Sequence, residues 1–232
     1  MRVPFEAAAR GSQRWIQLAV NDHAAFLDLA IREALGFSEP EPITWLSPLR
    51  EDEYAEYRDK GFIERLKLKL PTHPLKEFWP RRGPQWDALG RTDSDSVLLV
   101  EAKANLPELV SPASQASATS TSLIQRSLRE VQEFLGVEAN IDWTGKLYQF
   151  ANRIAHLYLL RKLNQIPAYL VFVYFIGDKE VGGPGSVSEW KAALAVVKGV
   201  LGIGDRHRLS RYMADVFIDV AKLTGTGFRK GD

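Results

Sequence analysis

The sequence contains no cysteine, which excludes structural disulfides and thiolate metal sites. Its four histidines lack any metal-ligand spacing such as H-E-x-x-H, so a histidine zinc site is not expected. It also lacks the phosphate-binding patterns G-x-x-x-x-G-K-[ST] and G-x-G-x-x-G, and the G-x-S-x-G pattern of serine hydrolases. The missing motifs argue against a nucleotide-binding loop, a dinucleotide-binding enzyme and a serine esterase.

Long apolar runs are missing as well. The run AYLVFVYFI at residues 168–176 is far shorter than the ~20 residues that a helix needs to span a bilayer. The first 15 residues contain no apolar core of signal-peptide length. Together with the absence of cysteine, this predicts a cytoplasmic protein that does not associate with membranes.

Neither sign of charge is in large excess: the sequence has 30 basic and 29 acidic residues, and its formal net charge is +1. Net charge therefore gives no support to nucleic-acid binding, and a binding face would have to come from local clusters of basic residues. Such clusters occur at Arg65/Lys67/Lys69, Lys76/Arg81/Arg82 and Arg206/His207/Arg208/Arg211.

The pattern of apolar residues predicts an α/β fold. Helices are expected at 12–36, 51–66, 123–136, 146–164 and 188–201, the last capped by Ser188, and strands at 86–89, 96–104, 168–176 and 213–220. The proline-rich stretch 37–48 and the low-complexity stretch 111–122 are expected to be loops. No repeat or linker is visible, so we predict one domain over 1–232, with a helical N-terminal part (about 1–70) and a core (about 71–220).

The stretch SVLLVEAKAN at residues 96–105 is an apolar strand with a charged end. Side chains alternate along a strand, so Glu101 and Lys103 share one face with Val97 and Leu99. Because both faces begin apolar, the pattern is typical of a central strand that is covered on both sides. Charges confined to one end of such a strand indicate a functional site at that end.

A preceding strand brings another acid to this end. If the RTDSD turn centres on residues 92–94, Asp87 lies opposite Leu99 and Gln85 lies opposite Glu101. In that register Asp87 and Glu101 are diagonal neighbours on one face, ~7–8 Å apart at the backbone. Two carboxylates at this spacing can converge on one divalent cation.

Magnesium suits such a pair, since it prefers oxygen ligands and commonly takes one or two carboxylates. It would lower the pKa of a bound water and neutralise charge on a phosphate, and Mn²⁺ can replace it. Lys103, beside Glu101, would position or deprotonate the water or offset charge in the transition state; as a base it would need a lowered pKa.

The sequence Asp87, thirteen residues, then Glu101-Ala102-Lys103 resembles the PD-(D/E)xK superfamily of nucleases. The resemblance implies the restriction-endonuclease-like fold, an αβββαβ core whose mixed four-stranded sheet is flanked by helices. It also implies Mg²⁺-dependent cleavage of DNA or RNA, with Asp87 and Glu101 as metal ligands and Lys103 as the catalytic lysine. The resemblance does not identify the substrate, for which we expect DNA rather than RNA. The family's proline directly precedes its aspartate, whereas Pro84 here stands three residues before Asp87.

The resemblance suggests a further metal ligand, because many members carry one more acid on the first core helix. Glu33, late on the expected helix 12–36, is our candidate, with Asp22 and Asp28 as alternatives. The competing interpretation is a solvated carboxylate on a helix surface.

The helix after the motif adds polar candidates. Gln149, Asn152, Arg153 and His156 follow the spacing i, i+3, i+4 and i+7 and therefore share one face. As in some superfamily members, Gln149 and Arg153 would reach a substrate phosphate. A solvated helix face is the alternative.

Two other interpretations of the whole protein remain open. The same fold could be a non-catalytic module that binds nucleic acid or a partner protein. The chain could also be an unrelated α/β structural or interaction domain with an accidental hairpin. In that case Asp87 and Glu101 point apart or lie farther apart than a shared ion could bridge, and the charged strand end simply emerges into water. A homodimer is compatible with all three interpretations.

Overall fold

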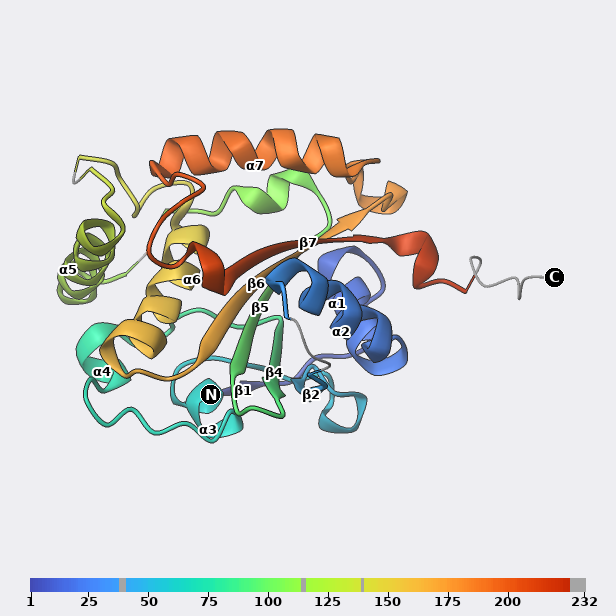
Figure 1. Cartoon of the computed structure of the whole chain (residues 1–232), viewed down its shortest axis with the longest axis horizontal. Helices are drawn as coiled ribbons and strands as arrows, with labels where there is room; N and C mark the ends of the chain where they lie inside the picture. Colours follow the sequence, from blue (N-terminus) through green and yellow to red (C-terminus); the bar gives the residue numbers. More distant parts are fainter. Residues whose placement is uncertain (38–40, 114–115, 139, 226–232) are drawn as a thin grey trace.

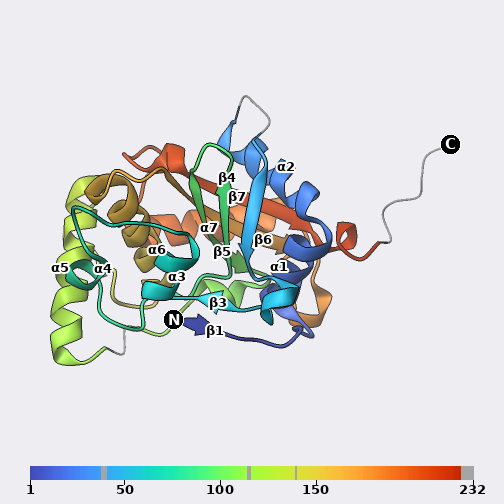
Figure 2. The same ribbon diagram turned by 90° about the horizontal axis from the view of Figure 1, so that it is seen from below.

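A computed structural model of the chain describes residues 1–37, 41–113, 116–138 and 140–225. Five strands form a mixed sheet through the middle of the molecule (Figures 1 and 2). In sheet order they are β2 (Ile43–Ser47), β4 (Ala88–Thr92), β5 (Val97–Lys103), β6 (Ala168–Ile176) and β7 (Met213–Asp219). Neighbours are antiparallel from β2 to β5 and parallel from β5 to β7. The predicted α/β class is confirmed.

The middle of the sheet is buried on both faces, as the sequence of β5 predicts. Every residue of β5 is buried, and Val97 and Leu99 pack into one hydrophobic core while Leu98, Val100 and Ala102 pack into the other. The apolar run predicted as a strand at 168–176 is β6, with the same bounds.

Helices cover each face (Figure 1). One face is covered by α1 (Gly11–Asp22) and α2 (Ala24–Leu35), which bury Ile16, Leu27 and Ile31 against it. The other is covered by α5 (Ala118–Leu135), α6 (Tyr148–Tyr158) and α7 (Val187–Leu201). A π-helical segment, Leu159–Leu163, follows α6 directly. Within the described ranges, no helix is long and apolar enough to cross a membrane.

Short elements lie beside the open end of the β4–β5 hairpin. β1 (Arg2–Val3) pairs antiparallel with β3 (Glu56–Tyr57), and Tyr57 also forms a bridge to Trp86, which precedes β4. Two short helices follow, α3 (Lys60–Arg65) and α4 (Leu75–Phe78). The bridge at Trp86 holds β3 next to the residues that lead into β4.

The N-terminal part differs from the predicted helices. The helix predicted at 12–36 is wrong as one element, because His23 leaves helical geometry at φ −134° and ψ 32° and separates α1 from α2. The helix predicted at 51–66 is also wrong: Tyr54 and Asp59 adopt positive φ, and β3 lies between them. Local backbone reversals therefore override the weak helical pattern.

Two predicted loops contain regular structure. β2 lies within 37–48, where Ile43 and Trp45 are buried; residues 38–40 are outside the described part. α5 begins within 111–122, where the Ser117 side chain caps it; residues 114–115 are outside the described part. The predicted cap of α7 is also wrong by two residues, because Ser186 accepts the hydrogen bond from the Glu189 amide.

Candidate active site

The β4–β5 hairpin sets the position of the candidate site. Ala88 pairs with Val100 and Leu89 with Leu99, so the predicted register, with Asp87 opposite Leu99, is wrong by two residues. A shift of two keeps every side chain on its predicted face, whereas a shift of one would invert the strand. Continued outward, the observed register brings Asp87 directly opposite Glu101.

Glu101 is the centre of a buried ion-pair cluster. It is only 1% exposed, and its two oxygens accept hydrogen bonds from the Lys103 ammonium and, at 2.5 Å, from the Arg153 Nε. Lys103, 5% exposed, also donates to the Gln149 side chain at 2.9 Å. The alternative in which Glu101 and Lys103 emerge into water is therefore wrong.

The cations keep Glu101 ionised. Burial by itself would raise its pKa, but the Arg153 guanidinium and the Lys103 ammonium outweigh burial and hold the pKa below its usual value. A buried carboxylate is tolerated when cationic partners compensate its charge, as Lys103 and Arg153 do here.

Asp87 accepts a hydrogen bond through only one of its two carboxylate oxygens among the described residues. Its Oδ2 accepts a hydrogen bond from the Ala102 amide at 2.7 Å, while its Oδ1 receives none from the residues that the structure describes. Burial raises the pKa of Asp87 well above its usual value, and the Glu101 and Glu56 carboxylates raise it further. The Glu101 charge therefore acts directly on Asp87 and disfavours its ionised form.

Glu56 is a third acid of this cluster that the sequence analysis missed. It lies on β3, is 5% exposed, and accepts hydrogen bonds from Gln13 at 3.2 Å and from Gln85 at 2.7 Å. Burial raises its pKa, and the Glu101 charge adds to the increase. A strand of two residues has no periodicity, so no signal in the sequence marks Glu56.

The polar face of α6 is buried rather than solvated. Arg153, 3% exposed, donates through Nη1 to the Asn152 side chain at 3.0 Å and through Nη2 to the Gln85 carbonyl at 2.7 Å. Its guanidinium also lies 4.8 Å from the centre of the Trp86 ring. Because all three nitrogens are bonded within the protein, Arg153 orients Glu101 and is poorly placed to contact a phosphate. Gln149 uses its oxygen for Lys103, and its amide nitrogen remains a donor.

His156 lies deeper, outside the acidic cluster. Its Nδ1 lies 2.8 Å from the Asn152 carbonyl, and its ring makes edge contacts with Phe62, Trp79 and Trp86. Burial lowers its pKa to about 3, so the imidazole is neutral near pH 7. It supports the packing beneath the cluster.

Glu33 does not join the cluster. It is exposed on α2, which packs against the face of the sheet opposite to the one that carries Glu101 and Lys103. The structure therefore gives Glu33 no contact with the predicted ligands, and Glu56 supplies the third carboxylate instead.

The cluster opens into a cleft of about 600 Å³. All the charged members of the cluster line it, together with Gln149, the N-terminal turn of α1 at Ser12 and the segment 110–113. The N-terminus of a helix favours anions because its amide groups point outward. Two exposed arginines, Arg81 and Arg82, lie on the segment that leads to Asp87.

The donors of the cleft fit a hard divalent cation in their chemistry. Carboxylate oxygens are its preferred ligands, and Asp87 has one oxygen without a hydrogen-bond donor from the described residues. Among those residues, no three His, Cys, Asp or Glu side chains are placed to hold a metal ion as they stand. A cation at Asp87 and Glu101 would therefore require the Glu101 ion pairs to shift.

Comparison with protein-family models, curated proteins and solved structures found no match for this chain. The case for a function consequently rests on the geometry and electrostatics of the cleft.

Proposed function

We propose that the protein is a metal-dependent nuclease that hydrolyses phosphodiester bonds of nucleic acid at the site of Asp87, Glu101 and Lys103. The observation that carries the proposal is the convergence of two buried charges, Glu101 and Lys103, with the half-buried Asp87 at the end of a central strand, in an open cleft. Burying such a cluster is costly, and a cation together with a phosphate would offset that cost. PD-(D/E)xK nucleases cleave DNA or RNA, and we propose DNA as the substrate.

The order of elements supports this proposal. Along the chain, the elements α2, β2, β4, β5, α6 and β6 occur in the order αβββαβ. Two insertions interrupt this order: β3, α3 and α4 lie between β2 and β4, and α5 precedes α6. β2, β4, β5 and β6 are also consecutive in the sheet. The order supports the αβββαβ core that the resemblance implies, so we include that topology in the proposal.

Each residue has a distinct role in the proposed reaction. Asp87 and Glu101 would hold Mg²⁺, with Glu56 adding negative charge nearby. The ion, when bound, supplies a water of lowered pKa and neutralises charge on the phosphate. Lys103, fixed by Glu101 and Gln149, orients the attacking water and offsets charge in the transition state.

Other groups would hold the substrate. The Gln149 amide nitrogen can donate to a phosphate oxygen, and the N-terminal turn of α1 lies on the same cleft. Arg81 and Arg82 add exposed positive charge on the segment next to Asp87. Arg153 acts as a positioning residue, because it holds Glu101 and Gln85 rather than facing the substrate.

One observation favours a non-catalytic binding module as the second candidate. Both oxygens of Glu101 are already paired with Lys103 and Arg153, so this part of the cluster is stable without a metal. A module of this kind would bind nucleic acid or a protein through the same cleft and would not cleave.

The deciding experiment combines cleavage and metal binding. The protein is incubated with supercoiled plasmid, linear duplex, single-stranded DNA and RNA, in Mg²⁺, Mn²⁺ or EDTA. We expect cleavage in either metal and none in EDTA. Lys103→Ala and Asp87→Ala are expected to lower the rate at least about 100-fold, because each removes a group that acts on the transition state.

Matched controls separate chemistry from folding. Lys179→Ala and Asp93→Ala remove the same charges at exposed positions and should leave cleavage unchanged. Each variant's melting temperature is compared with that of the parent protein. Absence of cleavage, together with no metal-induced rise in melting temperature that depends on Asp87, would reject the nuclease and favour the binding module.

A further inference from the structure

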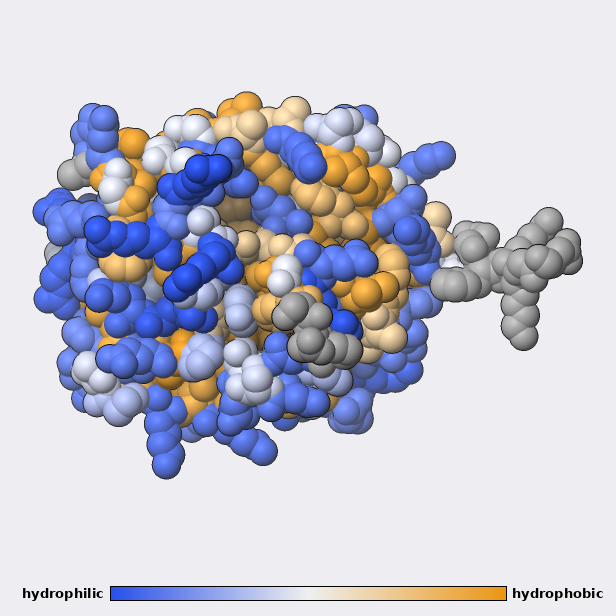
Figure 3. All heavy atoms as spheres, in the orientation of Figure 1, coloured by the Kyte–Doolittle hydropathy of each residue, from blue (hydrophilic) through white to orange (hydrophobic). Residues whose placement is uncertain are grey.

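A second cavity lies on the other side of α6 from the acidic cleft, between α6, α7 and the sheet. Its volume is about 190 Å³. In Figure 3 this face of the molecule is hollowed between α7 and the start of β7, with hydrophilic residues around the opening. The proposed nuclease site uses none of its residues, so a ligand in this cavity is independent of that proposal.

Aromatic rings form part of the cavity wall. The Phe172 ring lies 5.0 Å from Phe150 and 6.4 Å from Tyr174, centre to centre, with interplanar angles of 27° and 17°. Side chains of α7, among them Leu194 and Val197, close the opposite side. Nearly parallel rings on one wall favour a planar ligand that stacks on them.

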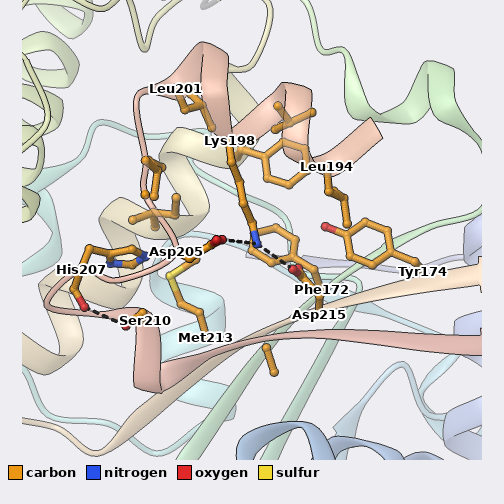
Figure 4. A pocket seen from close by; sticks show the side chains of 16 residues that line it. Phe172, Tyr174, Leu194, Lys198, Leu201, Asp205, His207, Ser210, Met213 and Asp215 are labelled. Carbon is orange, nitrogen blue, oxygen red and sulfur yellow. Dashed lines mark hydrogen bonds and ion pairs between the residues drawn. The ribbon is translucent and has the colours of Figure 1, made fainter. Parts of the chain in front are cut away.

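Polar groups meet at one place in the cavity (Figure 4). Tyr174 is fully buried, and its hydroxyl lies within reach of the Asp215 carboxylate but forms no well-aligned hydrogen bond with the residues that the structure describes. The Asp215 carboxylate is the nearby charge, and after burial it contributes most to raising the pKa of Tyr174. Asp215 also accepts a hydrogen bond from Lys198 at 3.1 Å. A buried hydroxyl without a well-aligned hydrogen bond costs about 1–3 kcal/mol, which a ligand acceptor would recover.

The ligand's size follows from the volume. An apolar cavity of about 150 Å³ accommodates a benzene ring, so about 190 Å³ suits a single six-membered ring with small substituents. The polar groups of the cavity indicate which hydrogen-bonding groups the edge of the ligand carries. Tyr174 donates a hydrogen bond, and Asp215 accepts one from a neighbouring position.

We infer that this cavity binds a pyrimidine-type base, a planar six-membered ring with a carbonyl acceptor beside an N–H donor. The carbonyl accepts from the Tyr174 hydroxyl, the N–H donates to Asp215, and the ring stacks on Phe172. Lys198 and Asp205 lie at the opening, where a sugar attached to the ring would leave the cavity.

Isothermal titration with uracil tests the inference without any measurement of cleavage. We expect binding, with adenine at least about tenfold weaker because its two fused rings exceed the cavity. Tyr174→Phe should weaken uracil binding about tenfold, the equivalent of one hydrogen bond. The melting temperature of this variant is compared with that of the parent protein, so that weaker binding is distinguished from a loss of folding.

A pair of variants on α7 tests the location. Val197→Phe fills the cavity and should abolish binding, whereas Val196→Phe adds the same ring one position away at a site that is 66% exposed, and should not change it. No binding of uracil at millimolar concentration would overturn the inference. Equal affinity in Tyr174→Phe and the parent protein would overturn it too, and that result remains available if Val197→Phe does not fold.

Two sources could supply the same ring: a free base or nucleoside, or an unstacked base of a nucleic-acid strand. Uridine and a short single-stranded oligouridylate are therefore titrated alongside uracil. Tighter binding of the oligonucleotide, in competition with uracil, assigns the cavity to a strand. Binding of uracil and uridine without the oligonucleotide assigns it to a free compound.

Discussion

The charges of the cleft are unbalanced at the level of single residues. The cluster contains three carboxylates, Glu56, Asp87 and Glu101, and two cations, Lys103 and Arg153, and Glu108 adds a fourth carboxylate to the lining of the cleft. Both cations form ion pairs with Glu101 and lower its pKa. The pKa values of Glu56 and Asp87 are raised, chiefly by burial. The uncompensated negative charge therefore lies on the two acids that have no cationic partner, where a divalent cation would be most stabilising.

Glu56→Gln should stabilise the protein in alkaline solution, by about 1 kcal/mol. Because the native pKa of Glu56 is raised, the native state holds this proton more tightly than the unfolded chain does. This tighter binding of the proton stabilises the native state fully below the pKa of Glu56 in the unfolded chain, near 4.5. The stabilisation is lost as the pH rises from that value to the native pKa. Urea denaturation at about pH 4 and about pH 8 measures the difference, which should vanish at the lower pH. A variant that is less stable in the alkaline buffer would contradict this account.

His156 should make the protein sensitive to acid. The native state keeps the imidazole neutral down to about pH 3, whereas the unfolded chain protonates it below about 6.5. As the pH is lowered from about 6.5 to about 3, the free energy of unfolding should therefore fall by about 1.4 kcal/mol per pH unit. Above about pH 6.5, His156 should not contribute to the pH dependence. His156→Phe keeps an aromatic ring at this position and removes the titration. Equal pH slopes for the variant and the parent protein would show that His156 is not buried and neutral.

Secondary-structure elements differ in how much of their position the sequence encodes. The end of β5 was predictable because its apolar run and its two charges are both visible in ten residues. Its register with β4 was not, since the turn residues Thr92 to Asp95 are all turn formers and do not specify the centre. The observed pairing of Arg91 with Val97 centres the turn on Ser94, one position later than expected, and Asp95 adopts the left-handed conformation with φ 67°.

Other elements escaped prediction for different physical reasons. β2 alternates buried and partly exposed residues as a strand should, but Pro42 and Pro48 flank it and favour a loop. β3 is too short to show a period, so Glu56 was missed with it. Lys103, Gln149 and Arg153 were predictable as candidates from spacing, whereas the network that joins them depends on how α6 packs against β5.

The contact between α6 and β5 gives a prediction at this scale. Arg153→Met should destabilise the protein by about 3 kcal/mol, because it removes one of the two cations that compensate the buried Glu101. Adding Glu101→Gln should recover part of that loss, since the carboxylate charge is then gone. Arg129→Met, exposed on α5, is the control and should change stability by less than about 0.5 kcal/mol. Additive effects in this double-mutant cycle would mean that the two residues do not interact energetically.

The sheet divides the whole molecule into two hydrophobic cores. α1 and α2 cover one core, and α5, α6 and α7 cover the other. β5 and β6 contribute alternate side chains to both, so neither core can lose its strands without exposing the other. This sharing is the physical basis for expecting 1–232 to behave as one domain, as the absence of a linker in the sequence predicts.

Cooperative unfolding tests this expectation. Ile16→Ala removes a fully buried side chain of one core, and Leu157→Ala removes one of the other. Each should cost about 2–5 kcal/mol and lower the midpoint of a single transition, in which tryptophan fluorescence and far-ultraviolet circular dichroism coincide. If the cores were independent, each variant would move only its own transition and leave a second one unchanged. Two separable transitions would therefore contradict a single domain and would place its boundary within the central sheet.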